Sequence, residues 1–180
     1  MALNDAVVLL ANLEMNNRMA KAYIALGANL EQPKAQLDAA CVALEALAET
    51  GSFQISPYYA SVPMGEFKQP DYINAVASIE TQHSPLELLD ALQAIEQQQG
   101  RVRLQHWGPR TLDLDLLLYD NLVMTSERLT IPHYGMKQRS FVLVPLFNLS
   151  PELILPCETP LKSLISAKLR SELQELDSDH

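Results

Sequence analysis

The chain has 180 residues, of which 48% are hydrophobic and 19% are charged, a composition typical of a folded globular domain rather than a disordered or fibrous chain. No apolar run approaches the roughly 20 residues that a membrane-crossing helix needs. No basic segment precedes the apolar run at residues 7–11, so we expect no signal peptide. We also expect no membrane partner and a cytoplasmic location. The net charge of −9 argues against general nucleic-acid binding, which requires a basic face.

The organisation of the chain indicates one main domain, and we expect a monomer. Residues 1–20 are interpreted as an N-terminal extension, residues 21–160 as the domain, and residues 161–180 as a helical, then acidic, tail that frays. The two cysteines, Cys41 and Cys157, show no metal-ligand spacing. Cys41 lies among apolar residues, which favours a reduced thiol in the core.

Alternation and helical periodicity predict a series of strands and helices. In chain order we expect a strand at 21–27, a helix at 33–49, strands at 54–61 and 72–80, a helix between Ser84 and Gly100, a strand at 112–119, a short strand at 122–124 and a helix at 139–149. The helix after Ser84 has the clearest boundaries, because Ser84, Pro85 and Glu87 form a capping box with proline in the first turn. Gly100 is suited to end that helix.

The order β-α-β-β-α-β is the ferredoxin-like arrangement of the α+β class. It predicts an antiparallel sheet with both helices on one face and the active site on the open, opposite face. Because side chains alternate across a strand, Asp113 and Asp115 are expected on the open face, together with Tyr72 and Asn74. The residues of the strand at 112–119 expected to point towards the helices are Leu112, Leu114, Leu116 and Leu118.

The two aspartates would have Cα atoms roughly 6–7 Å apart. Carboxylates at this separation repel each other, and a divalent cation removes the conflict. Magnesium prefers one or two carboxylates together with phosphate oxygens and water. An alternating Asp-x-Asp pattern on an exposed strand is equally consistent with solubilising charge, so the pattern alone leaves both interpretations open.

Positive charge is concentrated in one part of the sequence. Of the seven arginines, five lie between residues 101 and 139. Arg110 and Trp107 come just before the two aspartates, and arginine offers a planar fork of donors that suits phosphate. These arginines could be solvated surface residues, but beside a metal pair they favour a site for phosphoryl transfer.

Several motifs resemble the 6-hydroxymethyl-7,8-dihydropterin pyrophosphokinase family over residues 23–156. The most specific are Gly-Arg-Val-Arg at 100–103 and Trp-Gly-Pro-Arg-Thr-Leu-Asp-Leu-Asp at 107–115. Supporting motifs are Leu-Gly-Ala-Asn at 26–29, Gln-Pro-Asp-Tyr-Ile-Asn at 69–74 and Ile-Pro-His-Tyr at 131–134. The resemblance implies transfer of a pyrophosphoryl group from ATP to the hydroxymethyl group of a dihydropterin, with release of AMP, in folate biosynthesis.

The resemblance also implies roles for individual residues. Asp113 and Asp115 would hold two Mg²⁺ ions, and Arg101 and Arg110 would bind ATP phosphates and stabilise the charge of the transition state. The implied ATP-binding residues are Gln93, Glu96, Arg103, Trp107, Arg128, Thr130, His133, Tyr134 and Arg139. The implied pterin-binding residues are Ser61, Val62, Met64, Tyr72, Asn74 and Phe141, with the flat ring against Phe141 and its edge read by the amide of Asn74.

Two departures from the family pattern and two alternative functions accompany this interpretation. The segment Leu104–His106 is one residue shorter and less basic than in the family, and Ala28 stands where the family has serine. A different magnesium-dependent nucleotidyl- or phosphotransferase would also explain the aspartates and arginines, although not Tyr72, Asn74 and Phe141 together. A ferredoxin-like RNA-binding module is opposed by the acidic charge and by the lack of paired strand aromatics.

Overall fold

The computed structural model describes residues 18–65, 68–100 and 111–177. The strands are β1 Ala20–Ala28, β2 Gln54–Ile55, β3 Tyr59–Ser61, β4 Tyr72–Thr81, β5 Asp113–Tyr119, β6 Met124–Thr125, β7 Thr130–Ile131 and β8 Leu173–Glu175. The helices are α2 Pro33–Leu47, α3 Pro85–Gln98, α4 Ser140–Leu149 and α5 Ala167–Ser171, and 3-10 turns cover Met136–Gln138 and Leu161–Leu164. None of the helices in these ranges is long and apolar enough to cross a membrane.

The main sheet has the strand order β5-β1-β4-β3-β8, and its pairs are antiparallel. The first four of these strands have the order of a ferredoxin-like sheet, so the predicted fold class is confirmed. The strand expected at 54–61 is divided into β2 and β3. Pro57 lies between them and has no N–H to donate to the ladder, while the hydroxyl of Ser56 accepts a hydrogen bond from the backbone of Val76 at 3.0 Å.

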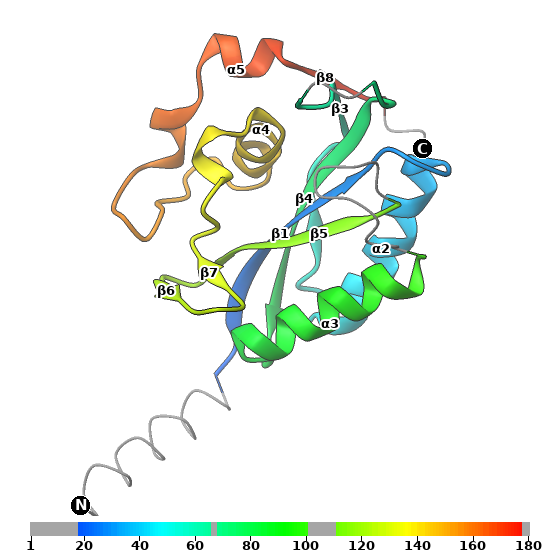
Figure 1. The fold of residues 1–180 in the computed structure, drawn as a ribbon. Coiled ribbons are helices and arrows are strands. Elements are labelled where there is room, and N and C mark those ends of the chain that lie inside the picture. The colour runs from blue at the N-terminus through cyan, green and yellow to red at the C-terminus, as the bar shows by residue number, and fades with distance from the viewer. Residues whose placement is uncertain (1–17, 66–67, 101–110, 178–180) are drawn as a thin grey trace, which may run out of the picture.

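Helices α2 and α3 cover one face of the sheet (Figure 1). Leu37 and Leu44 of α2 and Leu88 and Leu92 of α3 are fully buried in the same core cluster as Ile24 of β1. Burying such side chains stabilises the packing of helix on sheet by about 1.5–3 kcal/mol each.

The predicted ends of α3 are confirmed. The hydroxyl of Ser84 accepts a hydrogen bond from the backbone N–H of Glu87, and the carboxylate of Glu87 accepts one from the N–H of Ser84 at 2.8 Å. Gly100 follows the helix with a φ of 81°, a left-handed conformation that is common just after a helix and unfavourable for other residues.

The opposite face of the sheet is less open than we expected from the sequence. Helix α4 packs on this face (Figure 1), where Val142, Leu143 and Leu146 form a second core cluster with Tyr23 and Val76. The expectation of a fully uncovered face was therefore wrong. Because α4 covers part of the sheet, the polar residues at the ends of β1, β4 and β5 lie beside a helix instead of on a bare surface.

A β-bulge in β5 changes the side of the sheet to which some of its residues point. Tyr23 pairs with Leu118 whereas Ile24 pairs with Leu116, so Leu117 is an extra residue in this strand. Leu118 consequently joins the cluster under α4, and its predicted position on the side of α2 and α3 was wrong. Leu112, Leu114 and Leu116 do lie on that side, as predicted. Bulges reverse the alternation of side chains locally.

Residues 161–177 form regular structure, so our expectation that this part of the tail frays was wrong. It forms the 3-10 turn at 161–164, then α5 and β8. Strand β8 pairs with β3 through the register Tyr59–Glu175 and Ser61–Leu173. The tail thus adds an outer strand beside the predicted pterin side of the sheet.

Candidate active site

A row of residues across three strands forms the floor of the site. Gly27 of β1 pairs with Asn74 of β4 on one side and with Asp113 of β5 on the other. Residues paired across an antiparallel ladder point to the same face, so the amide and the carboxylate share one face, as predicted. Two strand spacings separate Asn74 from Asp113, about 10 Å between Cα atoms.

Gly27 keeps this floor open. A Cβ atom at this position would lie 3.3 Å from Oδ1 of Asn74 and 4.0 Å from the ring of Tyr72. Any other residue would therefore press on Asn74 and fill the space between it and Asp113. The motif at 26–29 pointed to this glycine, but residue reasoning did not single it out, because the close approach depends on which strands pair.

The second carboxylate, Asp115, faces His133. Its Oδ2 lies 4.0 Å from Nε2 of His133. The backbone N–H of His133 donates to the carbonyl of Leu117 at 2.9 Å, which fixes the segment after β7 against β5. A bend thus brings a histidine from 18 residues further along the chain to the carboxylate pair.

Burial and its neighbours hold His133 in the neutral form. Burial lowers the pKa of His133 below its usual range, the positive charge of Arg139 lowers it further, and Asp113 acts in the opposite direction. The Nδ1 atom accepts a hydrogen bond from the N–H of Gly135 at 3.2 Å. A neutral ring with Nδ1 as acceptor carries its proton on Nε2, which is the atom turned towards Asp115.

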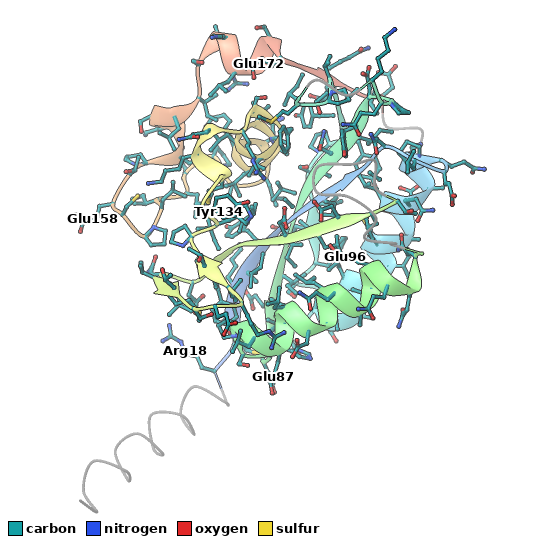
Figure 2. All side chains as sticks on the ribbon, in the orientation of Figure 1. Arg18, Glu87, Glu96, Tyr134, Glu158 and Glu172 are labelled. Carbon is teal, nitrogen blue, oxygen red and sulfur yellow. The ribbon has the colours of Figure 1, made fainter. Side chains whose placement is uncertain are left out.

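Aromatic rings and a guanidinium form the wall on the α4 side. His133 stacks on Tyr134 with ring centroids 4.6 Å apart. Arg139 lies 5.8 Å from the ring of Tyr134 and 5.9 Å from the ring of Phe141. Tyr134, labelled in Figure 2, is 76% exposed, so most of its ring is accessible to a ligand.

The pterin side of the predicted site is organised around Asn74. Its amide nitrogen donates to the hydroxyl of Ser61 at 2.8 Å, and both residues are buried. Tyr72 pairs with Ser61 in the register of β3 and β4 and is half-buried. Val62 and Met64 follow β3 and are largely exposed.

Two loops of the site are joined by Asn29, which the sequence analysis did not assign. Its amide donates to the side chain of Gln69 and to the carbonyl of Pro70, both at 3.0 Å. These contacts connect the motif at 26–29 with the motif at 69–74. The only sequence indication of this contact was that the residues at its two ends belong to motifs that resemble the family.

Two expected ATP-binding residues lie on α3. Glu96 is only 3% exposed, and its carboxylate accepts a hydrogen bond at 2.8 Å from the N–H of Leu114, between the two aspartates. Figure 2 labels Glu96 on α3 close to β5. Gln93 is half-exposed.

The remaining expected ATP-binding residues are divided between described and undescribed parts of the chain. Arg128 forms an ion pair with Asp90 of α3, and Thr130 belongs to β7, which pairs with β6. The predicted residues Arg101, Arg103, Trp107 and Arg110 lie outside the described residues.

The carboxylate pair fits a magnesium site. Asp113 and Asp115 lie two residues apart on one strand face, and their partners across β1 are Gly27 and Ala25, which are too small to fill the space beside them. The side chain of Asp115 is 38% exposed. Magnesium with phosphates needs only one or two protein carboxylates, so the pair supplies enough ligands.

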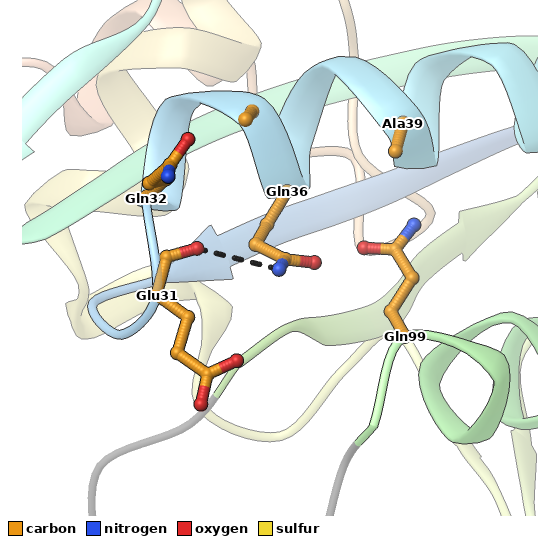
Figure 3. A pocket seen from close by; sticks show the side chains of 6 residues that line it. Glu31, Gln32, Gln36, Ala39 and Gln99 are labelled. Atoms are coloured by element: carbon orange, nitrogen blue, oxygen red, sulfur yellow. Dashed lines mark hydrogen bonds between the residues drawn. The ribbon is translucent and has the colours of Figure 1, made fainter.

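A hollow elsewhere on the surface lies on the helix side of the sheet. Figure 3 shows Glu31, Gln32, Gln36 and Gln99 around it, with the side chain of Gln36 donating to the carbonyl of Glu31 at 3.4 Å. It brings together amides of α2 and the end of α3. It contains none of the residues that we assigned to the site.

A family model described as 7,8-dihydro-6-hydroxymethylpterin-pyrophosphokinase (HPPK) matches residues 23–151. The chain belongs to the HPPK family. It is therefore a pyrophosphokinase, an enzyme of the diphosphotransferase class, as the motifs predicted.

Bacterial HPPK proteins are similar over nearly their whole length. The chain is 55% identical over 162 residues to the 2-amino-4-hydroxy-6-hydroxymethyldihydropteridine pyrophosphokinase of Haemophilus influenzae. The matched region covers 90% of this chain and 96% of that protein. It is 50% identical over 147 residues to the protein of the same name from Pseudomonas aeruginosa, covering 82% and 91% of the two chains.

Solved HPPK structures share the fold. A triple mutant of Plasmodium falciparum HPPK-DHPS, crystallised with pteroate, matches with a TM-score of 0.68 at 12% identity. The match covers 88% of this chain and 47% of the Plasmodium chain, so the chain spans about half of that longer protein. At this identity the likeness supports the HPPK fold alone.

Proposed function

We propose that the chain carries out the reaction of its family. It transfers the pyrophosphoryl group of ATP to the hydroxymethyl group of 6-hydroxymethyl-7,8-dihydropterin, giving AMP and the dihydropterin diphosphate, a step in folate biosynthesis. The observation that supports this most directly is the row Asn74–Gly27–Asp113. It holds an amide that can read a heterocycle and a carboxylate that can hold a cation on one surface.

Asp113 and Asp115 would hold two Mg²⁺ ions. The ions, when bound, neutralise charge on the phosphates of ATP and polarise them. The chain supplies the two carboxylates on one strand face, and Glu96 restrains the backbone between them through the N–H of Leu114. Catalysis of phosphoryl transfer depends mainly on such positioning and charge stabilisation.

The ATP side of the site combines donors with exposed rings. Nε2–H of His133 can donate to a phosphate oxygen, and Arg139 carries positive charge beside Tyr134 and Phe141. Thr130 and Arg128 lie on the β6–β7 hairpin that precedes His133, and Gln93 and Glu96 lie on α3. The family resemblance adds Arg101, Arg103, Trp107 and Arg110, with Arg101 and Arg110 stabilising charge at the transferred group.

The pterin would bind between Phe141 and Asn74. Phe141 offers an apolar face for the ring, and the amide of Asn74 and the hydroxyl of Ser61 offer donors and acceptors for its edge. Tyr72, Val62 and Met64 would complete this side. In the reaction the hydroxymethyl oxygen loses its proton and bonds to the β-phosphorus of ATP, while the bond from that phosphorus to the oxygen of AMP breaks.

The variant Asp115→Asn tests the carboxylate assignment. It removes a charge but keeps the shape of the side chain, so we expect kcat to fall by about 10²–10³-fold, as when one stabilising group is lost from the transition state. The melting temperature should stay near that of the wild type, because Asp115 is partly exposed. Steady-state formation of AMP and thermal unfolding measure the two effects.

Asp120→Asn is the matched control. Asp120 follows the far end of the same strand, where its carboxylate accepts a hydrogen bond from the N–H of Lys21 at 2.8 Å and its φ is 45°. Asparagine keeps the acceptor and tolerates this conformation, so turnover should be unchanged. Turnover of Asp115→Asn equal to that of the control would refute the metal-binding role of Asp115.

A further inference from the structure

Tyr59 lies where three elements of the pterin side meet. It is a residue of β3, its ring is 3% exposed, and its hydroxyl has a partner in each of two other elements. Asn148 of α4 donates its amide N–H to this hydroxyl, and the hydroxyl donates to the carboxylate of Glu175 in β8 at 3.2 Å. One phenol therefore connects β3, α4 and the C-terminal strand β8.

The β3 backbone at Tyr59 also contacts the residue that would read the pterin. Tyr59 pairs with Asn74 in the ladder of β3 and β4. The amide nitrogen of Asn74 lies 3.5 Å from the carbonyl of Tyr59 and donates to Ser61, two residues further along β3, at 2.8 Å. The position of β3 thus sets the orientation of the Asn74 amide.

The other partner of Tyr59 lies on the helix that carries the stacking ring. Asn148 and Phe141 are seven residues apart in α4, which is about two helical turns, so they share one face of the helix at about 10 Å along its axis. Phe141 also lies beneath the guanidinium of Arg139. A contact at Asn148 therefore fixes the helix face that presents Phe141.

We propose that Tyr59 is a positioning residue for the pterin, which sets the spacing between Phe141 on α4 and Asn74 on β4 through its hydrogen bonds to Asn148 and Glu175. This inference rests on the proposed function. The hydroxyl of Tyr59 is engaged by Asn148 and Glu175, so its role is to hold α4, which carries Phe141, in place relative to the strands that carry Asn74 and Ser61. Asn148 supplies the link to α4, and Glu175 anchors the hydroxyl from the outer strand.

Two properties of the phenol suit it to this role. Burial raises the pKa of Tyr59 to about 12, with a further contribution from Glu175, so the hydroxyl stays protonated and can donate and accept at once. A phenylalanine would keep the ring and its packing but lose both hydrogen bonds. Helix α4 and the strands would then be held only by apolar contacts, which do not fix a distance as hydrogen bonds do.

The test compares Tyr59→Phe with Tyr58→Phe. The hydroxyl of Tyr58 donates to Asp38 at 2.7 Å on the opposite, helix-covered side, so this neighbour undergoes the same chemical change away from the site. Affinities are measured by calorimetry with 6-hydroxymethylpterin in the presence of Mg²⁺ and a non-hydrolysable ATP analogue. We expect Tyr59→Phe to weaken pterin binding about three- to tenfold, the effect of losing a typical hydrogen bond.

The same variant should leave the affinity for the ATP analogue within twofold of the wild type. Tyr58→Phe should leave the affinity for the pterin unchanged. In turnover, KM for the pterin should rise while kcat and KM for ATP are retained. Equal losses of pterin affinity in the two variants, or no loss in Tyr59→Phe, would overturn the proposal.

Asn148→Ala separates positioning from a loss of packing at Tyr59. If Tyr59 acts through Asn148, the double variant Tyr59→Phe/Asn148→Ala should bind the pterin no more weakly than the single variant with the lower affinity. The reason is that the free-energy effects of substituting two residues in contact do not add. Fully additive losses would contradict the proposal. Wild-type protein that binds the pterin but forms no AMP would refute the proposed reaction. It would not refute the role of Tyr59, which is decided by the pterin affinity of Tyr59→Phe relative to that of Tyr58→Phe.

Discussion

At the scale of single residues, the two cysteines differ through their neighbours. Burial raises the pKa of Cys41, which is half-buried near Tyr58. Cys157 is exposed, and the ammonium of Lys137 lies 2.9 Å from its sulfur. Hydrogen bonding from Lys137 lowers the pKa of Cys157 to about 7, so a large part of this thiol is ionised at neutral pH.

We predict that alkylation by iodoacetamide modifies Cys157 and spares Cys41. Because the thiolate is the nucleophile, the rate at Cys157 should rise with pH and reach half of its maximum near pH 7. In Lys137→Met this midpoint should move to higher pH. Mass spectrometry of digested protein gives both rates, and an unchanged midpoint in Lys137→Met would contradict the role of the ammonium.

Individual site residues were predictable where strand alternation decides their facing. Asp113, Asp115 and Asn74 share a face, as expected, because antiparallel pairing repeats the alternation from strand to strand. Leu118 was assigned wrongly, because a bulge depends on how β5 pairs with β1 and not on the sequence of β5 alone. Gly27 was missed for a similar reason, since its close approach to Asn74 arises only in the assembled sheet.

At the scale of elements, β5 is an outer strand of the sheet and carries both aspartates. Its inner edge pairs with β1, and α3 supports it through Glu96 and the N–H of Leu114. Leu114 is 4% exposed, so water cannot easily replace this partner. A carboxylate on a helix therefore fixes the strand that would hold the cations, which gives Glu96 a structural role beside its predicted place at the ATP site.

We expect Glu96→Ala to lower the free energy of unfolding by about 1–3 kcal/mol, because a buried N–H loses its acceptor. Glu96→Gln keeps an acceptor oxygen and should lose less. The exposed neighbour Gln97 is the control, and Gln97→Ala should change stability by less than about 0.5 kcal/mol. Urea unfolding measures all three, and equal stability of Glu96→Ala and Gln97→Ala would contradict the supporting role.

The elements themselves were largely predictable from local patterns. The capping box of α3 and its terminal glycine are read from adjacent residues, and both were confirmed. The docking of α4 on the second face and of β8 on β3 was not predicted. Both depend on contacts between segments far apart in the sequence, and the polar composition of the tail gave no indication of a paired strand.

At the scale of the whole molecule, an acidic chain would bind the polyanion ATP through local placement of positive charge. The net charge is −9, yet Arg128 lies on the β6–β7 hairpin, and Arg139 lies in the segment that leads from β7 into α4, where its charge acts on His133 beside the aspartates. Segments from β1, β4, β5 and α4 converge there, and the family model covers all of them. The family resemblance identified the substrates, whereas physical reasoning alone had left other transferases open.

The identity of the products tests the proposed reaction most directly. The protein is incubated with Mg²⁺, 6-hydroxymethyl-7,8-dihydropterin and ATP, and nucleotides are separated by chromatography. We predict AMP in equal amount to dihydropterin diphosphate, and no AMP without the pterin. ADP would indicate transfer of a single phosphoryl group, and free pyrophosphate with a nucleotidylated pterin would indicate a nucleotidyl transferase; either result, or AMP no higher than in the control, would contradict the proposed function.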